Sequence, residues 1–195
     1  MIKYDLDILK IISNDIPPKC GRILISEPLL CDDVFSRSVV LLTDYFKDSF
    51  MGLVLNKPYQ FKLHEMLDGI NNTEILLYSG GPVDRDILYF LHKFSFIDEA
   101  VEIIPGLFLG GNVDQIFELI NSGMANNSNL KAFVGCSGWA PGQLEEEILF
   151  NSWLVAETNI DFVFNNDSDL WKKSLDFVDS RYQIWKLFPI DPDLN

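Results

Sequence analysis

Cysteine is scarce in this sequence, and the few cysteines present are poorly spaced for a covalent or metal-bound scaffold. Cys20, Cys31 and Cys136 are an odd number, lie far apart and form no CxxC pair. A disulfide framework uses an even set of cysteines, and a structural zinc site uses paired ligands. We therefore expect reduced thiols that pack as small buried side chains, with no metal site and no cofactor.

Long hydrophobic runs are also absent. No apolar stretch approaches the roughly 18 residues that a membrane-spanning helix needs. Residues 1–9 carry Asp5 and Asp7 and have neither the basic start nor the apolar centre of a secretory signal. The sequence therefore predicts a cytoplasmic protein that does not interact with a membrane.

Positively charged residues are few as well. The chain has 15 basic against 29 acidic residues, which gives a net charge of −14, and no Lys/Arg cluster interrupts the acidic surplus. Proteins that bind nucleic acids obtain most of their non-specific affinity from Lys and Arg contacts to phosphates. We therefore expect no direct binding of nucleic acid, and the same sign of charge disfavours anionic membrane surfaces.

Apolar residues, by contrast, are plentiful enough for a sizeable core. Hydrophobic residues make up 48% and aromatic residues 13% of the 195 residues. A chain of this length without a Pro/Ser/Gly-rich linker falls in the range of one large domain. The sequence therefore predicts a single domain over residues 1–195, and it indicates no oligomeric state.

The hydrophobic pattern predicts a sheet with helices packed on it. Short runs of β-branched and aliphatic residues bounded by turn residues predict strands at 22–26, 38–43, 51–55, 74–78, 87–92, 107–109, 131–135, 153–156 and 161–164. Apolar residues at helical spacing predict helices within residues 1–16, after an N-cap at Asn112, near Pro141, and around Trp171. Strands come early and helices late. This order predicts an α+β fold with packed helices and a mixed, largely antiparallel sheet that can be curved or barrel-like.

Five blocks of residues follow one another in the order of one known family. The blocks are Pro28, Leu30, Asp32 and Phe35 with RSVV at 37–40; GLVLNKP at 52–58; GGPV at 80–83 with LH at 91–92; GL at 106–107 with GG at 110–111; and Gly135, Gly138, Trp139, Gly142, Gln143, Leu144, Glu145, Glu147, Ile148 and Trp153. Together they resemble the AlgH/YqgE-like family, bacterial proteins of which some are named transcriptional regulators. The resemblance covers about residues 21–175, so that the N-terminal helix and a tail at 181–195 lie outside it.

The resemblance implies a fold of mixed sheet and helices but no catalytic residues. Three positions depart from the family pattern, with Tyr45 in place of a frequent His, Cys136 in place of Tyr and Lys57 in place of Arg. Loss of the His removes a possible acid or base from that loop.

Motifs for nucleophilic or phosphate chemistry are incomplete. In Gly135-Cys136-Ser137-Gly138 the second glycine comes one residue too early for a nucleophile elbow. A Cys136 nucleophile would need His64 or His92 as its base. No Lys follows Gly142, so the phosphate-binding P-loop pattern is absent.

Acidic residues support an alternative hypothesis, in which the protein is an enzyme. Glu145 and Asp32 with His92 could form the acid/base site of a hydrolase of unfamiliar type. Glu145 and Glu147 are two residues apart on a predicted helix, so they point to different sides and at most one can join a shared site. Helix capping and a solvated helix face are the simpler explanation for these acidic residues.

Recognition is the leading functional hypothesis. Trp139 lies beside glycines, where it either plugs the core or forms one wall of a pocket. Asn56 and Arg37 are most simply structural. The candidate binding surface consists of Gly138, Trp139, Gln143, Glu145, Gly80, Gly81, Asn56, Asp32, Arg37 and His92. The sequence therefore favours a non-enzymatic regulatory or binding protein that acts through a protein partner or a small ligand.

Overall fold

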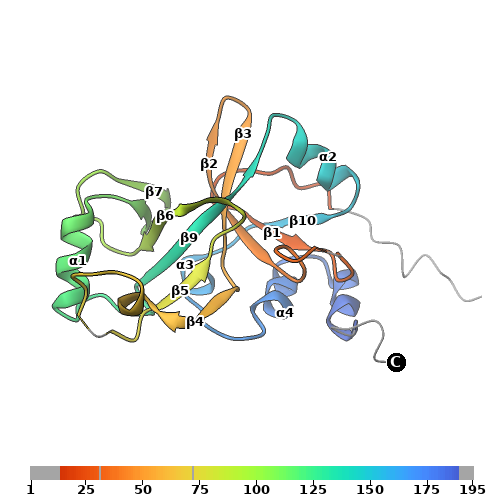
Figure 1. The fold of residues 1–195 in the computed structure, drawn as a ribbon. Coiled ribbons are helices and arrows are strands. Elements are labelled where there is room, and N and C mark those ends of the chain that lie inside the picture. Colours follow the sequence, from red (N-terminus) through yellow and green to blue (C-terminus); the bar gives the residue numbers. More distant parts are fainter. Residues whose placement is uncertain (1–13, 31, 72, 189–195) are drawn as a thin grey trace, which may run out of the picture.

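A curled β-sheet organises the structure (Figure 1), a computed structural model that describes residues 14–30, 32–71 and 73–188. Its ten strands follow the order β10-β1-β2-β3-β9-β6-β8-β7, with β5 paired to β9 and β4 paired to β5. The strands are β1 Ile23–Ser26, β2 Val39–Phe46, β3 Ser49–Val54, β4 Pro58–Lys62, β5 Leu76–Ser79, β6 Val83–His92, β7 Ala100–Ile104, β8 Leu107–Gly110, β9 Leu130–Trp139 and β10 Trp153–Ala156. Only the pairing of β5 with β9 is parallel among the described strands. The predicted largely antiparallel sheet is confirmed, and more of the described residues lie in strands than in helices.

Strand β9 is the centre of this sheet. Along one edge it pairs with β6, and along the other edge it pairs first with β5 and then with β3. Its side chains alternate between two sides, as in any strand. Phe133 belongs to one hydrophobic cluster with Leu154 and Trp171, whereas Leu130 and Ala132 belong to another. The strand thus separates two parts of the core.

Short helices pack around the sheet (Figure 1). They are α1 Val113–Asn121, α2 Gln143–Leu149, α3 Ile160–Val163 and α4 Leu170–Ser174, with 3-10 helices η2 Leu63–Glu65, η3 Leu175–Phe177 and η4 Ser180–Leu187. The predicted cap of α1 is confirmed, because Asn112 Oδ1 accepts a hydrogen bond of 3.1 Å from the backbone N–H of Gln115. Among the described residues no helix is both long and apolar enough to cross a membrane.

Several predicted elements need correction. Residues 161–164 are not a strand but lie largely in helix α3, which Asn159 caps through a 2.9 Å bond from the N–H of Phe162. The predicted last helix is divided into α4 and η3. Strands β4 and β7 were not predicted, and β9 continues to Trp139, beyond the predicted end at residue 135. Of the N-terminal helix predicted within residues 1–16, residues 1–13 lie outside the described residues, and residues 14–16 are not helical.

Candidate functional site

The late tryptophan and glutamate motif forms a hydrogen-bond network around one carboxylate. Glu147 Oε2 accepts hydrogen bonds from the indole N–H of Trp139 at 2.9 Å and of Trp153 at 2.8 Å. Glu147 Oε1 accepts a third bond, of 2.9 Å, from Gln143 Nε2. The carboxylate therefore fastens helix α2 to the ends of β9 and β10.

This network decides between the two predictions for Trp139, a plug of the core or one wall of a pocket. Its side chain is only 3% exposed and packs against Phe35 and Trp153. Trp139 thus plugs the core and does not form a pocket wall. Glu145 lies exposed on α2, while Glu147 points inward, so the two glutamates do serve different sides of the helix.

The Gly80-Gly81-Pro82 turn, which joins β5 to β6 and contains two candidate residues, is a point of close backbone contact with β9. A Cβ atom on Gly80 would overlap the carbonyl oxygen of Gly135, and one on Gly81 would overlap that of Cys136. The carbonyl of Gly80 accepts bonds from Val54 N–H at 3.0 Å and from the Ser137 hydroxyl at 3.1 Å. These glycines are required by packing.

The Cys136–Ser137 pair lacks the surroundings of a nucleophile. Both side chains are buried, and burial raises the pKa of the Cys136 thiol, which keeps it protonated and unreactive. The Ser137 hydroxyl donates to a backbone carbonyl, and the two histidines bond elsewhere: His64 Nδ1 lies 2.8 Å from the carbonyl of Thr73, and His92 Nε2 lies 2.9 Å from that of Gly110. The motif is therefore structural.

His92 has both ring nitrogens in use. Its Nε2 donates to the carbonyl of Gly110, and its Nδ1 accepts a 3.3 Å bond from the N–H of Phe94. The ring stacks on Phe94 and Phe108 and has no exposed surface. Burial lowers the pKa of His92, so the ring is held in its neutral form.

The remaining candidates near β1 and β2 hold loops in place. Asp32 Oδ1 accepts bonds of 2.8 Å from the N–H groups of Val34 and Phe35. Asn56 bridges to β2, because its Oδ1 accepts from Val39 N–H and its Nδ2 donates to the carbonyl of Arg37, both at 2.9 Å.

Arg37 joins this region to the end of the described chain. Its guanidinium lies 4.7 Å from the centre of the Trp171 ring and donates a 2.8 Å bond to the carbonyl of Phe188. Asp32 and His92 thus bond to different backbone groups, and Glu145 lies exposed on α2, so the three do not form one site. Within the described parts of the chain, no group of three His, Cys, Asp or Glu side chains could hold a metal ion.

A cavity that the sequence did not reveal lies between the sheet and the segment joining α3 to α4. Its volume is about 250 Å³. It is lined by Leu55, Asn56, Pro58, Leu76, Tyr78, Asn165, Asn166, Asp167, Ser168 and Leu170. Of these residues only Asn56 was a predicted candidate. The lining is apolar on the strand side and rich in amide groups on the side of residues 165–168, which suits a small polar molecule.

Lys131 is the unusual residue beside this cavity. Only 1% of its surface is exposed. Its Nζ lies 3.3 Å from the carbonyl oxygen of Asn165, 3.5 Å from that of Leu55 and 4.5 Å from the centre of the Tyr78 ring. All three contacts are cavity-lining residues, so the ammonium lies directly behind this lining, of which Lys131 itself is not part. Burial lowers the pKa of Lys131 to about 7.

Tyr78 is part of this lining. Its hydroxyl donates a 2.9 Å hydrogen bond to Asn166 Oδ1, and burial raises its pKa to about 12. Lys131 could have been noticed in the sequence, because it is a charged residue at the start of an otherwise apolar predicted strand. Its neighbours in that strand alternate between two parts of the core.

A second hollow of about 440 Å³ is lined by Pro17, Pro18, Lys19, Cys20, Phe50 and Glu145. The thiol of Cys20 donates to the carbonyl of Thr43 at 3.3 Å, and its pKa is raised, mainly by burial. This hollow contains the predicted candidate Glu145 but offers fewer polar groups than the cavity beside Lys131.

Two solved structures resemble this fold over most of its length. One, from Corynebacterium diphtheriae, has a TM-score of 0.72 at 20% identity and covers 96% of this chain and 100% of its own. The other, the solution structure of the AlgH protein from Pseudomonas aeruginosa, has a TM-score of 0.70 at 23% identity and covers 90% of this chain and 98% of its own. At these identities the likeness concerns the fold alone.

Sequence comparison gives the family. A UPF0301 protein of Bacteroides thetaiotaomicron is 40% identical over 196 residues, which is 100% of both chains. Another, from Chlorobium phaeobacteroides, is 37% identical over 177 residues, covering 90% of this chain and 95% of the relative. The model of the AlgH-like family matches residues 23–183. The resemblance seen in the sequence is therefore confirmed, and the chain belongs to the AlgH-like family.

Proposed function

We propose that this protein is a non-enzymatic binding protein that takes a small polar molecule into the cavity beside Tyr78 and Asn166. The observation that carries the proposal is the lining of this cavity, which combines an apolar wall with amide and hydroxyl groups. Such a combination is typical of small-ligand sites. A volume of about 250 Å³ limits the ligand to the size of a small metabolite.

The hydrolase alternative has less support. His92 is buried with both ring nitrogens bonded, Asp32 caps its own loop, and Glu145 lies exposed on α2. A general base must reach the proton that it removes. We expect Glu145→Gln and the wild type to behave alike in assays with ester, amide or phosphate substrates. A turnover that the wild type shows and Glu145→Gln loses would favour the enzyme.

A regulatory role would then run through a protein partner that senses the loaded state. The net charge of −14 supports this route over direct contact with DNA. The glycine and tryptophan positions Gly80 and Trp139 serve packing, so the partner surface is better sought around the cavity.

Native mass spectrometry of the protein mixed with a small-metabolite extract tests the proposal. Ser168→Trp should block the cavity, because Ser168 is an exposed lining residue. Ser95→Trp, at another exposed serine, is the matched control. We expect a small-molecule adduct on the wild type and on the control but not on Ser168→Trp. An adduct that persists in Ser168→Trp, or no adduct with any extract, would count against the cavity as the site.

A further inference from the structure

The charge of Lys131 has no carboxylate to answer it. Other lysines of the described chain form ion pairs with acidic residues: Lys62 with Glu74, Lys172 with Asp169, Lys173 with Asp167, and Lys186 with Asp176. Lys131 forms no ion pair with any described residue, and its hydrogen bonds are to two backbone carbonyls. At 3.3 and 3.5 Å these bonds are longer than the usual N–H···O distance of about 2.9 Å. An ammonium group carries three donors, so at least one is left for another acceptor.

This arrangement is costly in the empty protein. A buried charge is destabilising unless an opposite charge or strong hydrogen bonds compensate it. The protein has 29 acidic residues, yet the one that lines the cavity, Asp167, pairs with Lys173 at 2.5 Å. The cavity beside Lys131 is therefore a place where an additional negative group would be stabilised.

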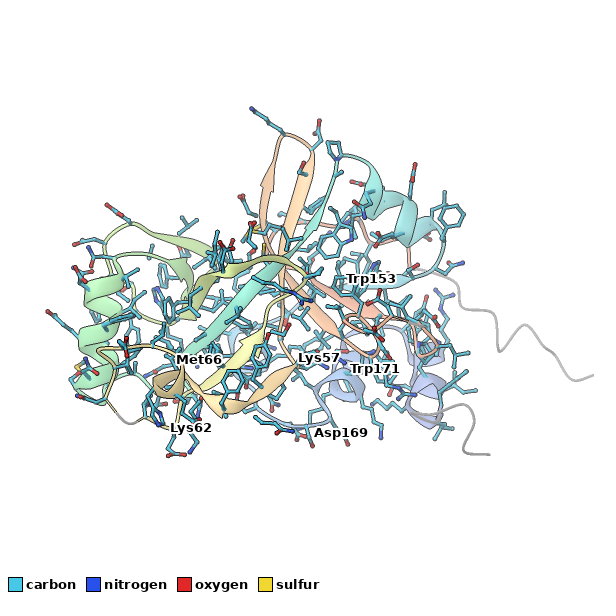
Figure 2. All side chains as sticks on the ribbon, in the orientation of Figure 1. Lys57, Lys62, Met66, Trp153, Asp169 and Trp171 are labelled. Atoms are coloured by element: carbon cyan, nitrogen blue, oxygen red, sulfur yellow. The ribbon has the colours of Figure 1, made fainter. Side chains whose placement is uncertain are left out.

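Lys57 is another lysine without an ion pair in the described chain, and its neighbours in the sequence line the cavity. It stands between the lining residues Asn56 and Pro58, at the junction of β3 and β4 (Figure 2). Its Nζ donates a 2.7 Å bond to the carbonyl of Ser36, and it forms no ion pair with the described residues. The ammonium of Lys57 therefore lies against Ser36, whereas that of Lys131 contacts residues that line the cavity.

Neutral donors complete a site for an anion. Asn165 Nδ2 and the Ser168 hydroxyl belong to lining residues and have no hydrogen-bond partner within the described chain, whereas Asn165 Oδ1 is occupied by the N–H of Asp167. The lining also contains the apolar residues Leu55, Leu76 and Leu170. The lining therefore combines hydrogen-bond donors with apolar surface.

We propose that the cavity selects a small carboxylic acid with a compact apolar body, whose carboxylate accepts hydrogen bonds from Lys131 Nζ and Asn165 Nδ2. A carboxylate is acceptor-only and matches a site that offers donors. Its bond with an ammonium is stronger than a neutral hydrogen bond. This inference rests on the proposed function, because it concerns the ligand of the same cavity.

The test compares acids with their uncharged analogues. Short branched aliphatic carboxylates, such as 4-methylpentanoate, and the corresponding primary amides are titrated into the protein and followed by amide NMR shifts of the lining residues. Each pair has nearly the same shape and differs in charge. We expect the acid to bind at least about tenfold more tightly than its amide, as charge-assisted hydrogen bonds imply.

Variants assign this preference to one residue. Lys131→Met should abolish the preference for the acid, while Lys186→Met, which removes a surface lysine paired with Asp176, should retain it. Should Lys131→Met fail to fold, the side-chain NMR signal of Lys131 in the wild type gives the same information. The acid should shift the Lys131 Cε resonance and the amide should leave it in place.

The possible outcomes separate this inference from the proposed function. Acid and amide binding equally at the lining residues would overturn the carboxylate preference and leave a ligand-binding cavity. A preference unchanged in Lys131→Met would overturn the role of Lys131. No shift at any lining residue with any acid or amide of the series would overturn both.

Discussion

The buried lysine of β9 should make the stability of this protein depend on pH. Burial lowers the pKa of Lys131 to about 7 in the folded protein, while the unfolded chain retains the usual 10.5. Between these values the unfolded state binds a proton that the folded state does not bind. The free energy of unfolding therefore rises with pH from about 7 toward 10.5 and falls as the pH is lowered through this window. Since one pKa unit corresponds to about 1.4 kcal/mol, the full effect is on the order of 5 kcal/mol.

Urea denaturation of wild type and Lys131→Met at pH 7, 8 and 9 measures this effect. The difference between the two proteins matters, because burial also raises the pKa of Cys20 and Cys136, which lowers stability as the pH approaches 9. We expect Lys131→Met to be more stable than the wild type at pH 7 and the difference to shrink as the pH rises. A difference that stays constant with pH would show that Lys131 has an ordinary pKa.

Glu147 should be worth more to stability than any other glutamate of α2. Glu147→Ala would leave the indole N–H groups of Trp139 and Trp153, which are 3% and 1% exposed, without their acceptor. Unsatisfied buried donors cost about 1–3 kcal/mol each, so we expect a loss of about 2–6 kcal/mol in urea denaturation. Glu146→Ala, at an exposed position of the same helix, is the control and should change stability by less than about 0.5 kcal/mol. Equal effects of the two variants would refute the role given to this network.

At the scale of single residues, the sequence identified important positions more readily than their tasks. Trp139, Gln143 and Trp153 all belonged to the late motif, but the sequence left open whether the motif forms a core or a pocket. The answer depends on Glu147, which lies within hydrogen-bond distance of all three only once α2 packs against β9 and β10. Lys131 was passed over because it stands at the edge of the predicted strand, whereas the segment after α3 covers it in the fold.

At the scale of elements, the crossing of the Gly80 turn and β9 should tolerate no side chain. Gly80 does not have a positive φ, so the effect of Gly80→Ala is steric alone: the new Cβ would overlap the carbonyl oxygen of Gly135. We expect a loss of about 3 kcal/mol or more, or failure to fold, since backbone cannot move aside as a side chain can. Thermal unfolding and soluble yield measure the effect.

Gly138→Ala is the matched control for this crossing. Gly138 also lies in β9 without a positive φ, and its Cβ would meet only Val83 Cγ2 at an ordinary 3.8 Å. The control should change stability by about 0.5 kcal/mol or less. If Gly80→Ala is equally mild, the two segments do not approach as closely as the structure has them.

Helices and strands could be predicted where the sequence pattern is local. Prediction failed where contacts with residues far along the chain decide the structure. Strands at residues 23–26 and 153–156 and the capped helix after Asn112 follow from apolar runs and a cap. Residues 161–164 have the composition of a strand, but Asn159 caps a helical turn there and Phe162 and Val163 fill the core beneath it. Strands β4 and β7 are polar or exposed at several positions, and their pairing with β5 and β8 holds them in the sheet.

At the scale of the whole molecule, most charged side chains lie at the solvated acidic surface, whereas the charge of Lys131 is buried. Most ion pairs, such as that of Lys62 at the outer end of β4 (Figure 2), have at least one well-exposed partner. Surface pairs of this kind contribute little to stability. The desolvated side chain of Lys131 lies in β9, against the carbonyl of Asn165 in the segment between α3 and α4. The charge of Lys131 beside the cavity is therefore opposite in sign to the net charge of the protein as a whole.

That overall charge predicts that the protein does not bind DNA directly. A net charge of −14 repels the phosphate backbone, and the arginine and lysine side chains of Arg37, Lys57 and Lys131 are all partly or fully turned inward. In fluorescence anisotropy with a labelled mixed-sequence duplex at about 50 mM salt, where non-specific binders are strongest, we expect no binding even at the roughly 10⁻⁴ M limit of non-specific affinity. Binding that weakens steeply as salt is added would contradict this prediction, because such a slope measures phosphate contacts by basic side chains. A protein that fails to bind DNA in this assay can still influence transcription, but it must do so through a ligand or a protein partner.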